Sequence, residues 1–303
     1  MSLDADAIAN RRRLKRRLVF WRLLALVVAI GAVGFLVWDD ERISLGDRIA
    51  QVDIDGVILN DEERLRTLAR LGADDSVKAI ILRIDSPGGT VVAGEELYRA
   101  VRELAAAKPV VAVIAGTGAS AAYMVALATD RIIARENSIT GSIGVVLQTF
   151  DLTGAMEKLG VTPTLFKSAP LKDQPNPFEP VTPGARAAIQ AVVDDTYRWF
   201  VGLVVQRRGL APATALQLSD GRIYTGRQAS SLNLIDATGG IEEARVWLAE
   251  ARDVSRDLPV DRIEPSRRLD VPTGVFGLVR KTLFSETLRI DGLVSLWQPD
   301  GLR

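Results

Sequence analysis

VKAIILRIDSPGGT, residues 77–90, joins an apolar run to a proline and a pair of glycines. The run Val77–Ile84 has the length and composition of a strand that is buried in a sheet. Asp85–Thr90 has the composition of a strand-to-helix turn, and a helical pattern follows at Glu95–Ala107. Because strand, connection and helix form the repeating unit of α/β proteins, this stretch indicates that fold class.

The same alternation continues along the chain. Strand-like apolar segments are present at Ile49–Leu59, Val110–Ala115 and Arg131–Ala134, with a short apolar stretch at Ile143–Leu147. Helices are predicted at Ala119–Ala128, Leu152–Leu159 and Gly184–Arg208, the last from its helical spacing of apolar residues. We therefore expect an α/β domain over residues 49–255, with its sheet covered on both sides.

The N-terminal region combines basic and apolar residues. Seven basic side chains lie within residues 1–22: Arg11, Arg12, Arg13, Lys15, Arg16, Arg17 and Arg22. The apolar segment 18–38 is interrupted only by Arg22 and carries Trp21 and Trp38 near its ends. This pattern predicts a transmembrane helix, with residues 1–17 in the cytoplasm and everything after a linker at 39–48 across the membrane. A cleaved signal peptide and a buried helix of a soluble domain are the alternatives.

Residues 256–303 form a predicted C-terminal extension. Pro259, Pro265 and Pro272 punctuate a polar stretch, and an amphipathic piece runs from Val275 to Leu296. Such a segment can pack on a neighbouring subunit, on the domain or on the membrane surface, and the sequence does not choose among these.

Composition restricts the possible chemistry. The chain contains no histidine and no cysteine, which excludes a Ser-His-Asp triad, a Cys-His pair and the usual zinc sites. The 38 basic and 38 acidic side chains balance, which argues against a nucleic-acid surface. We expect no metal, no cofactor and no nucleic-acid partner. A serine nucleophile activated by a neutral lysine remains possible.

Four positions are candidates for such chemistry. Ser120 lies among small residues between a predicted strand and a predicted helix, where the helix N-terminus favours a developing alkoxide. The glycines Gly88 and Gly89 allow backbone N–H groups to converge on an oxyanion. Lys172 is a candidate base, which acts only when it is neutral. Each position also has an ordinary explanation, as an N-cap or packing serine, a turn, or a solvated lysine.

The order of several motifs resembles the signal peptide peptidase A family, which consists of membrane-anchored bacterial Ser-Lys peptidases. The resemblance extends from Val52 to about Glu250. The matching motifs are Asp85–Gly89, residues 118–123, Thr140–Val145, Lys167-Ser168 with Lys172-Asp173, and above all Asp220–Ala229 followed by Leu232–Asp236.

This resemblance implies a Clp-protease/crotonase-like spiral α/β fold. It implies that Ser120 is the nucleophile, Lys172 the general base and Ser142 the residue that orients the lysine. The oxyanion donors would be the N–H groups of Gly88 or Gly89 and of Ala121. It also implies a ring-like homo-oligomer in which adjacent protomers supply the serine and the lysine. One difference from the family is that Ala121-Ala122 follow the serine, where two glycines are usual.

The resulting hypothesis is a serine endopeptidase that is anchored in the bacterial inner membrane by residues 18–38. It would degrade remnant signal peptides or similar apolar, extended peptides through an acyl-enzyme. Two alternatives keep the fold: crotonase-type chemistry on acyl thioesters, and a membrane-anchored oligomeric scaffold that binds peptides without cutting them.

Overall fold

The computed structural model describes residues 20–28, 46–263 and 294–296. The chain divides into two compact units, residues 1–46 and 47–303. In the first unit, residues 20–28 are helical and exposed, and the rest of the predicted membrane segment 18–38 lies outside the described residues. None of the helices within the described ranges is both long enough and apolar enough to span a bilayer.

The second unit is built on a mixed sheet. Nine strands of the described chain join it, and its main path runs through β6 (Ile223–Thr225), β5 (Ile139–Gly141), β3 (Val110–Ala119), β2 (Val77–Thr90), β1 (Arg48–Ile58) and β8 (Val260–Ile263). Strand β4 (Arg131–Ala134) pairs with the first half of β3, and β7 (Ala237–Thr238) pairs with β4. Strand β9 (Val294–Leu296) pairs with the end of β2. Pairing is parallel except for β5 with β6 and β2 with β9.

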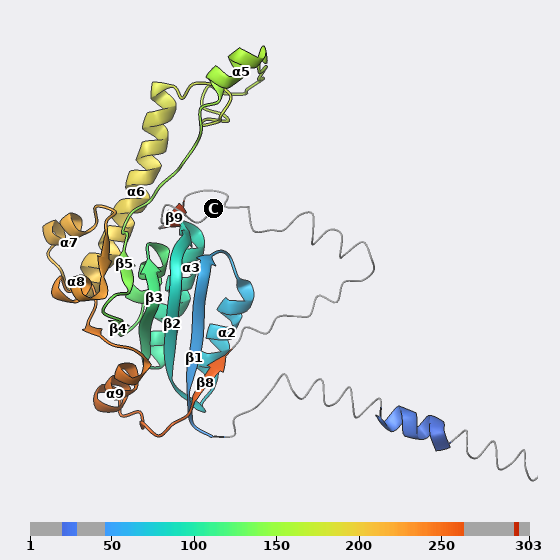
Figure 1. Ribbon diagram of the computed structural model, residues 1–303, viewed down its shortest axis with the longest axis vertical. Coiled ribbons are helices and arrows are strands. Elements are labelled where there is room, and N and C mark those ends of the chain that lie inside the picture. The colour runs from blue at the N-terminus through green and yellow to red at the C-terminus, as the bar shows by residue number, and fades with distance from the viewer. Residues whose placement is uncertain (1–19, 29–45, 264–293, 297–303) are drawn as a thin grey trace, which may run out of the picture. The chain divides into compact units, whose positions relative to one another are not determined.

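Helices cover both faces of this sheet (Figure 1). One face packs on α2 (Glu62–Ala73), α3 (Val91–Ala107), α4 (Ala121–Leu127) and the second half of α6 (Pro183–Arg208). The other face packs on α9 (Ile241–Arg252). Alternate residues of β2 enter the two cores: Ile80, Leu82 and Ile84 enter the first, and Ala79 and Ile81 the second. The predicted two-sided α/β sheet is therefore confirmed.

The remaining helices are short: α5 (Thr153–Leu159), α7 (Pro212–Leu218) and α8 (Gly226–Ser231). Side-chain caps define where several helices begin. Thr90 accepts the Ala93 N–H at the start of α3, and Thr182 accepts the Ala185 N–H at the start of α6. Such caps satisfy backbone donors that the first helical turn leaves without a partner.

The glycine-rich stretch after Ile84 is a strand, so its prediction as a turn was wrong. β2 continues to Thr90 because β1 pairs with it on one side, with Val57 opposite Gly88 and Ile58 opposite Gly89. The backbones are unusually close there. A Cβ on Gly89 would lie 1.9 Å from the Ile58 carbonyl oxygen, so glycine is required for close packing and not for a turn.

Other boundaries also differ from the sequence-based ones. The helix expected from Glu95 begins at Val91, and β3 extends to Ala119. Helix α2 was not predicted, although Leu65, Leu68 and Leu71 recur at helical spacing and pack on the core. Within the expected C-terminal extension, β8 pairs in parallel with β1.

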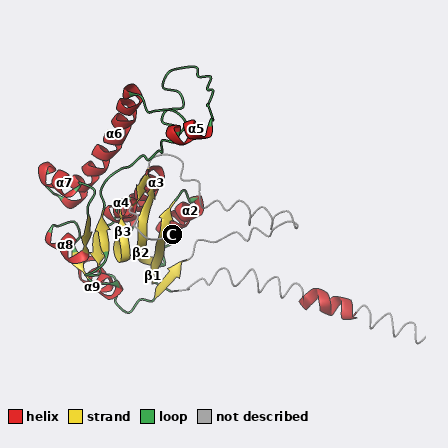
Figure 2. Cartoon of the chain, turned by 45° about the horizontal axis from the view of Figure 1, so that its top comes forward, coloured by secondary structure: helices red, strands yellow, loops and turns green. Residues whose placement is uncertain are grey.

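Residues 146–195 form an extension that we call the arm. It contains α5, the loop that follows it and the first half of α6. Asn176 is the one buried residue between positions 146 and 182. Figures 1 and 2 both show α5 and the loop between α5 and α6 at the end of α6 that is remote from the sheet. The arm therefore contributes little to the core of its own chain.

Tyr123 connects α4 to the C-terminal half of the domain. Its side chain is fully buried, and its hydroxyl donates to the Leu234 carbonyl at 2.6 Å. Burial raises the pKa of this phenol well above its ordinary value. The hydroxyl therefore stays neutral and acts as a permanent donor.

We expect Tyr123→Phe to lower the free energy of unfolding by about 1–3 kcal/mol, because the Leu234 carbonyl would remain buried without a donor. Urea denaturation measures this. Tyr224→Phe is the matched control, since the Tyr224 hydroxyl donates at 3.0 Å to the carbonyl of Leu218, a residue that is only partly buried. Water can replace that hydroxyl, so the loss should be smaller, and an equal loss would contradict the explanation.

Candidate active site

Ser120 occupies the junction between β3 and α4. Its backbone has φ 58° and ψ −122°, a conformation that residues with a side chain rarely adopt. The Ser120 N–H donates to the Gly141 carbonyl at 2.8 Å, and the Met124 N–H donates to the Ser120 carbonyl at 3.0 Å. These bonds to β5 and α4 hold the strained residue in place, as is common at functional sites. Within one chain the serine is 1% exposed.

The oxyanion candidates on β2 lie beside this turn. Ser86 pairs with Gly118, two residues before the serine, so the strand of Gly88 and Gly89 is the direct neighbour of the Ser120 turn. The Gly88 N–H donates to the Ser86 Oγ at 3.1 Å, and Gly88 has φ 110°. The sequence-predicted glycines and serine are thus brought together by the pairing of β2 with β3.

Strand β9 pairs antiparallel with the same segment of β2. Its register places Leu296 opposite Gly88 and Ser295 opposite Gly89. The edge formed by residues 88–90 therefore accepts an extended chain.

Ala121 and Ala122 are fully buried at the start of α4. Helix α3 leaves space for them, because residue 94 is a glycine. A Cβ on Gly94 would lie 3.0 Å from the Ala121 Cβ and 3.5 Å from the Met124 Sδ. The methyl group that distinguishes Ala121 from glycine is therefore accommodated by a glycine on the facing helix.

Ser142 lies directly after β5. Its N–H donates to the Arg222 carbonyl at 2.8 Å, and its φ of 50° is again unusual for a residue with a side chain. The preceding residue, Gly141, receives the hydrogen bond from the Ser120 N–H. Ser142 is thus placed next to the serine turn by the pairing of β5 with β3.

Lys172 is not brought to Ser120 within one chain. It is exposed, and it belongs to the loop between α5 and α6 at the remote end of the arm (Figures 1 and 2). The Lys172 N–H donates to the Ala169 carbonyl at 3.0 Å, which gives the loop a tight turn at this point.

Two residues that sequence reasoning missed hold the Lys172 loop together. The Asn176 side-chain amide donates to the Asp173 carbonyl at 2.7 Å and to the Glu179 carboxylate at 2.8 Å. The same carboxylate forms an ion pair with Lys167. The flanking prolines of Pro175-Asn176-Pro177 were the available signal, because they restrict the backbone on both sides of the asparagine.

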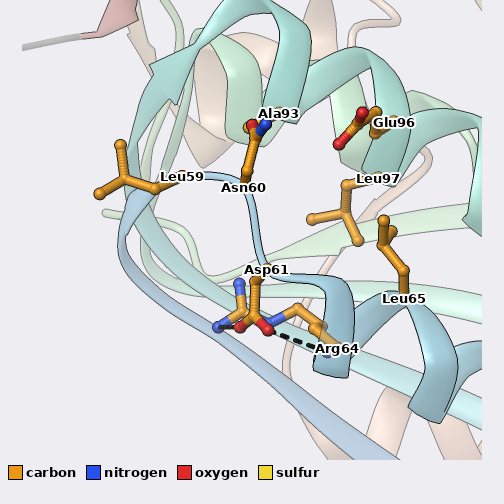
Figure 3. Close-up of a pocket in the computed structure, with 8 residues that line it drawn as sticks. All are labelled: Leu59, Asn60, Asp61, Arg64, Leu65, Ala93, Glu96 and Leu97. Carbon is orange, nitrogen blue, oxygen red and sulfur yellow. Dashed lines mark hydrogen bonds and ion pairs between the residues drawn. The ribbon is translucent and has the colours of Figure 1, made fainter. Parts of the chain in front are cut away.

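A small pocket lies where the chain passes from β1 to α2, beside α3, and its lining residues stabilise the fold. Leu59, Leu65 and Leu97 line the pocket together with Asp61 and Arg64, whose side chains meet on one side of it (Figure 3). Asp61 accepts the Arg64 N–H at 3.0 Å as the N-cap of α2, and the two side chains also form an ion pair at 3.5 Å. This cap and ion pair stabilise the start of α2 three residues after Ile58, the residue against which Gly89 packs.

Family comparisons agree with this architecture. A family model described as Clp protease matches residues 42–140, and one described as peptidase family S49 matches residues 102–255. The mixed α/β sheet with a Clp-protease-like domain and these matches define a serine peptidase. The S49 match alone covers about half of the chain. The chain belongs to peptidase family S49.

Curated relatives extend the likeness beyond the family models. A Methanocaldococcus jannaschii protein assigned as a protease is 36% identical over 84% of this chain and 86% of its own length. A Synechocystis protein with the same assignment is 35% identical over 77% and 85%. An Enterococcus faecium protein assigned as signal peptide peptidase SppA is 34% identical over 61% of this chain and 54% of its own. The resemblance to the signal peptide peptidase A family is thus confirmed.

We expect Gly94→Ala to reduce peptidase activity by about 10-fold or more, because the new methyl group presses on Ala121 at the serine turn. Adding Ala121→Gly to this variant should restore most of the loss, since it removes the opposing methyl group. Peptide hydrolysis by the single and double variants measures this coupling.

Gly72→Ala is the matched control, because a Cβ there meets only the Leu104 Cδ1, at 3.4 Å. It should leave the activity unchanged. Independent, additive effects of Gly94→Ala and Ala121→Gly would contradict the packing argument.

Proposed function

We propose that this protein is a membrane-anchored serine endopeptidase in which Ser120 is the nucleophile and Lys172 the general base. The observation that carries the proposal is the Ser120 turn, which is held in a strained conformation beside the glycines of β2. A strained backbone at a sharp strand-to-helix junction is typical of a nucleophile that the fold holds in one orientation. The S49 family membership supports the same class of chemistry.

A second copy of the chain would complete the site. Lys172 is exposed on the arm and remote from Ser120, so it cannot accept the Ser120 proton within one chain. The arm also exposes large apolar side chains, among them Phe150 at 68%, Leu159 at 77% and Phe166 at 97%. Contact with a neighbouring protomer would bury these side chains and remove water from the lysine. We therefore place the serine and the lysine of each site on adjacent protomers of a homo-oligomer.

The chemical steps follow from these roles. Neutral Lys172 accepts the Ser120 hydroxyl proton as Oγ attacks the peptide carbonyl, and Ser142 orients the lysine amine. The tetrahedral oxyanion accepts hydrogen bonds from the Ala121 N–H and from the N–H of Gly89 or Gly88. The lysine then gives its proton to the leaving amine. Water, deprotonated by the same lysine, hydrolyses the acyl-enzyme and releases the serine.

The substrates we propose are remnant signal peptides or similar apolar, extended segments. Pairing of β9 with residues 88–90 supports this, because it shows that the edge next to the serine accepts an antiparallel strand. An anchor at residues 18–38 would raise the local concentration of the enzyme near membrane-bound peptides. We place this anchor in the bacterial inner membrane, with the N-terminus in the cytoplasm and the peptidase domain on the opposite side. The proposed reaction uses no cofactor.

Ser120→Ala and Lys172→Ala should each lower peptide hydrolysis by at least about 1000-fold, because nucleophile and base act as a unit. Lys158→Ala is the matched control on the same arm and should retain activity. The measurement is hydrolysis of a fluorogenic apolar peptide by the full-length, detergent-solubilised protein, with oligomer size checked for each variant. Full activity in Ser120→Ala would disprove the proposal. An inactive parent protein with intact assembly would favour the peptide-binding scaffold.

Co-expression of Ser120→Ala with Lys172→Ala tests where the two residues come from. If adjacent protomers supply them, about one quarter of the sites in random hetero-oligomers contain an intact pair, and activity should return to that level. Sites built within one chain would give no recovery, which would overturn the shared-site arrangement and leave the roles of the two residues intact.

A further inference from the structure

The pairing between β2 and β3 is interrupted just below the candidate site. Ile84 pairs with Ile114, and the next pair is Ser86 with Gly118. Between these pairs β2 advances by two residues, while β3 advances by four. The additional residues make β3 bulge at positions 115–117, and a bulge leaves backbone groups without their usual partner on the neighbouring strand.

Asp85 fills this interruption with its side chain. The residue lies between the two pairs, and its Oδ1 accepts the Thr117 N–H at 2.9 Å. The carboxylate thus takes the place of the backbone acceptor that the bulge has removed. Because a hydrogen bond to an ionised acceptor is stronger than one between neutral groups, it is a firm connection between the strands.

Gly116 allows the carboxylate to come this close. A Cβ at position 116 would lie 2.6 Å from the Asp85 Oδ1 and 3.0 Å from its Oδ2. Any larger residue would therefore displace the carboxylate or the bulge. The glycine and the aspartate form one unit with the Thr117 N–H.

The unit formed by Asp85, Gly116 and the Thr117 N–H lies a few residues before the candidate site on both strands. Asp85 precedes Gly88 by three residues on β2, and Thr117 precedes Ser120 by three residues on β3. The hydrogen bond therefore joins the two chain segments three residues before the first glycine and three residues before the serine. A change in this bond would move the serine turn relative to the N–H groups of β2.

We propose that Asp85 is a positioning residue, which sets the distance between Ser120 and the oxyanion-binding glycines through its bond to Thr117. The inference rests on the proposed function, since it takes Ser120 as the nucleophile. It assigns Asp85 no contact with substrate. Its carboxylate acts through the backbone of the bulge.

The test compares Asp85→Ala with Asp85→Asn, because the asparagine keeps a carbonyl oxygen at the Oδ1 position. We expect Asp85→Ala to lower kcat per active site by about 100-fold with KM changed by less than about 3-fold, as expected for misplaced catalytic groups. Asp85→Asn should recover kcat to within about 5-fold of the parent protein. Active sites are counted with a fluorophosphonate probe on the full-length oligomer, so a loss of folded protein does not count as a loss of kcat.

Asp55→Ala is the matched control. Asp55 lies opposite Asp85 on β1 and forms an ion pair with Arg83 at 3.0 Å, but it makes no bond to the bulge. Its removal should change kcat by less than about 2-fold. Gly116→Ala provides a second variant that keeps the carboxylate and displaces it, and kcat per site should again fall. Hydrogen exchange of the 115–119 amides should be faster in Asp85→Ala and unchanged in Asp55→Ala.

Two results would overturn the inference on its own: kcat per site in Asp85→Ala equal to that in Asp55→Ala, or Asp85→Asn as impaired as Asp85→Ala. The serine variant separates this failure from that of the proposed function. Full activity in Ser120→Ala would overturn the proposed function and this inference with it. An inactive Ser120→Ala protein together with an unimpaired Asp85→Ala protein would overturn the role of Asp85 alone.

Discussion

Strand β2 pairs with β1 from Val77 to Gly89 and with β3 from Ile80 to Ser86, and both of its faces enter apolar cores. Pairing with β1 holds Gly88 and Gly89 directly, and pairing with β3 holds β2 as far as Ser86, two residues before Gly88. The serine turn is held to the same frame through β3. The relative position of the candidate nucleophile and oxyanion donors is therefore a property of the sheet and not of flexible loops.

Small residues near the site serve close approach between backbones or helices. Gly89 packs on the Ile58 carbonyl, and Gly94 faces the methyl group of Ala121. At Gly116 the missing side chain admits the Asp85 carboxylate. These contacts explain how the candidate site can hold its groups in a precise arrangement without histidine: packing positions the backbone, and Ser120 and the N–H groups of the glycines are parts of that backbone or attached directly to it.

The arm differs from the core in its physical character. Core residues around the serine are buried and strongly packed, whereas the arm exposes apolar side chains and carries Lys172. An isolated chain gains little stability from such a segment, since burial is the main source of folding free energy. Glu179 and Asn176 nevertheless hold the lysine loop in a defined shape. A preformed loop on an apolar arm is suited to contact with another surface, because less conformational entropy is lost on binding.

The sequence by itself determined the fold class, the strands at 131–134 and near 49–59, the long helix α6 and the relation to signal peptide peptidase A, because apolar periodicity and motif order are local properties. It also identified Ser120, Ser142 and the glycine pair as candidates. Only the tertiary structure decided that residues 85–90 are a strand, that Asp85 bonds to Thr117, that Gly94 accommodates Ala121 and that Lys172 lies apart from Ser120. Each of these depends on contacts between segments distant in sequence, which local patterns do not encode.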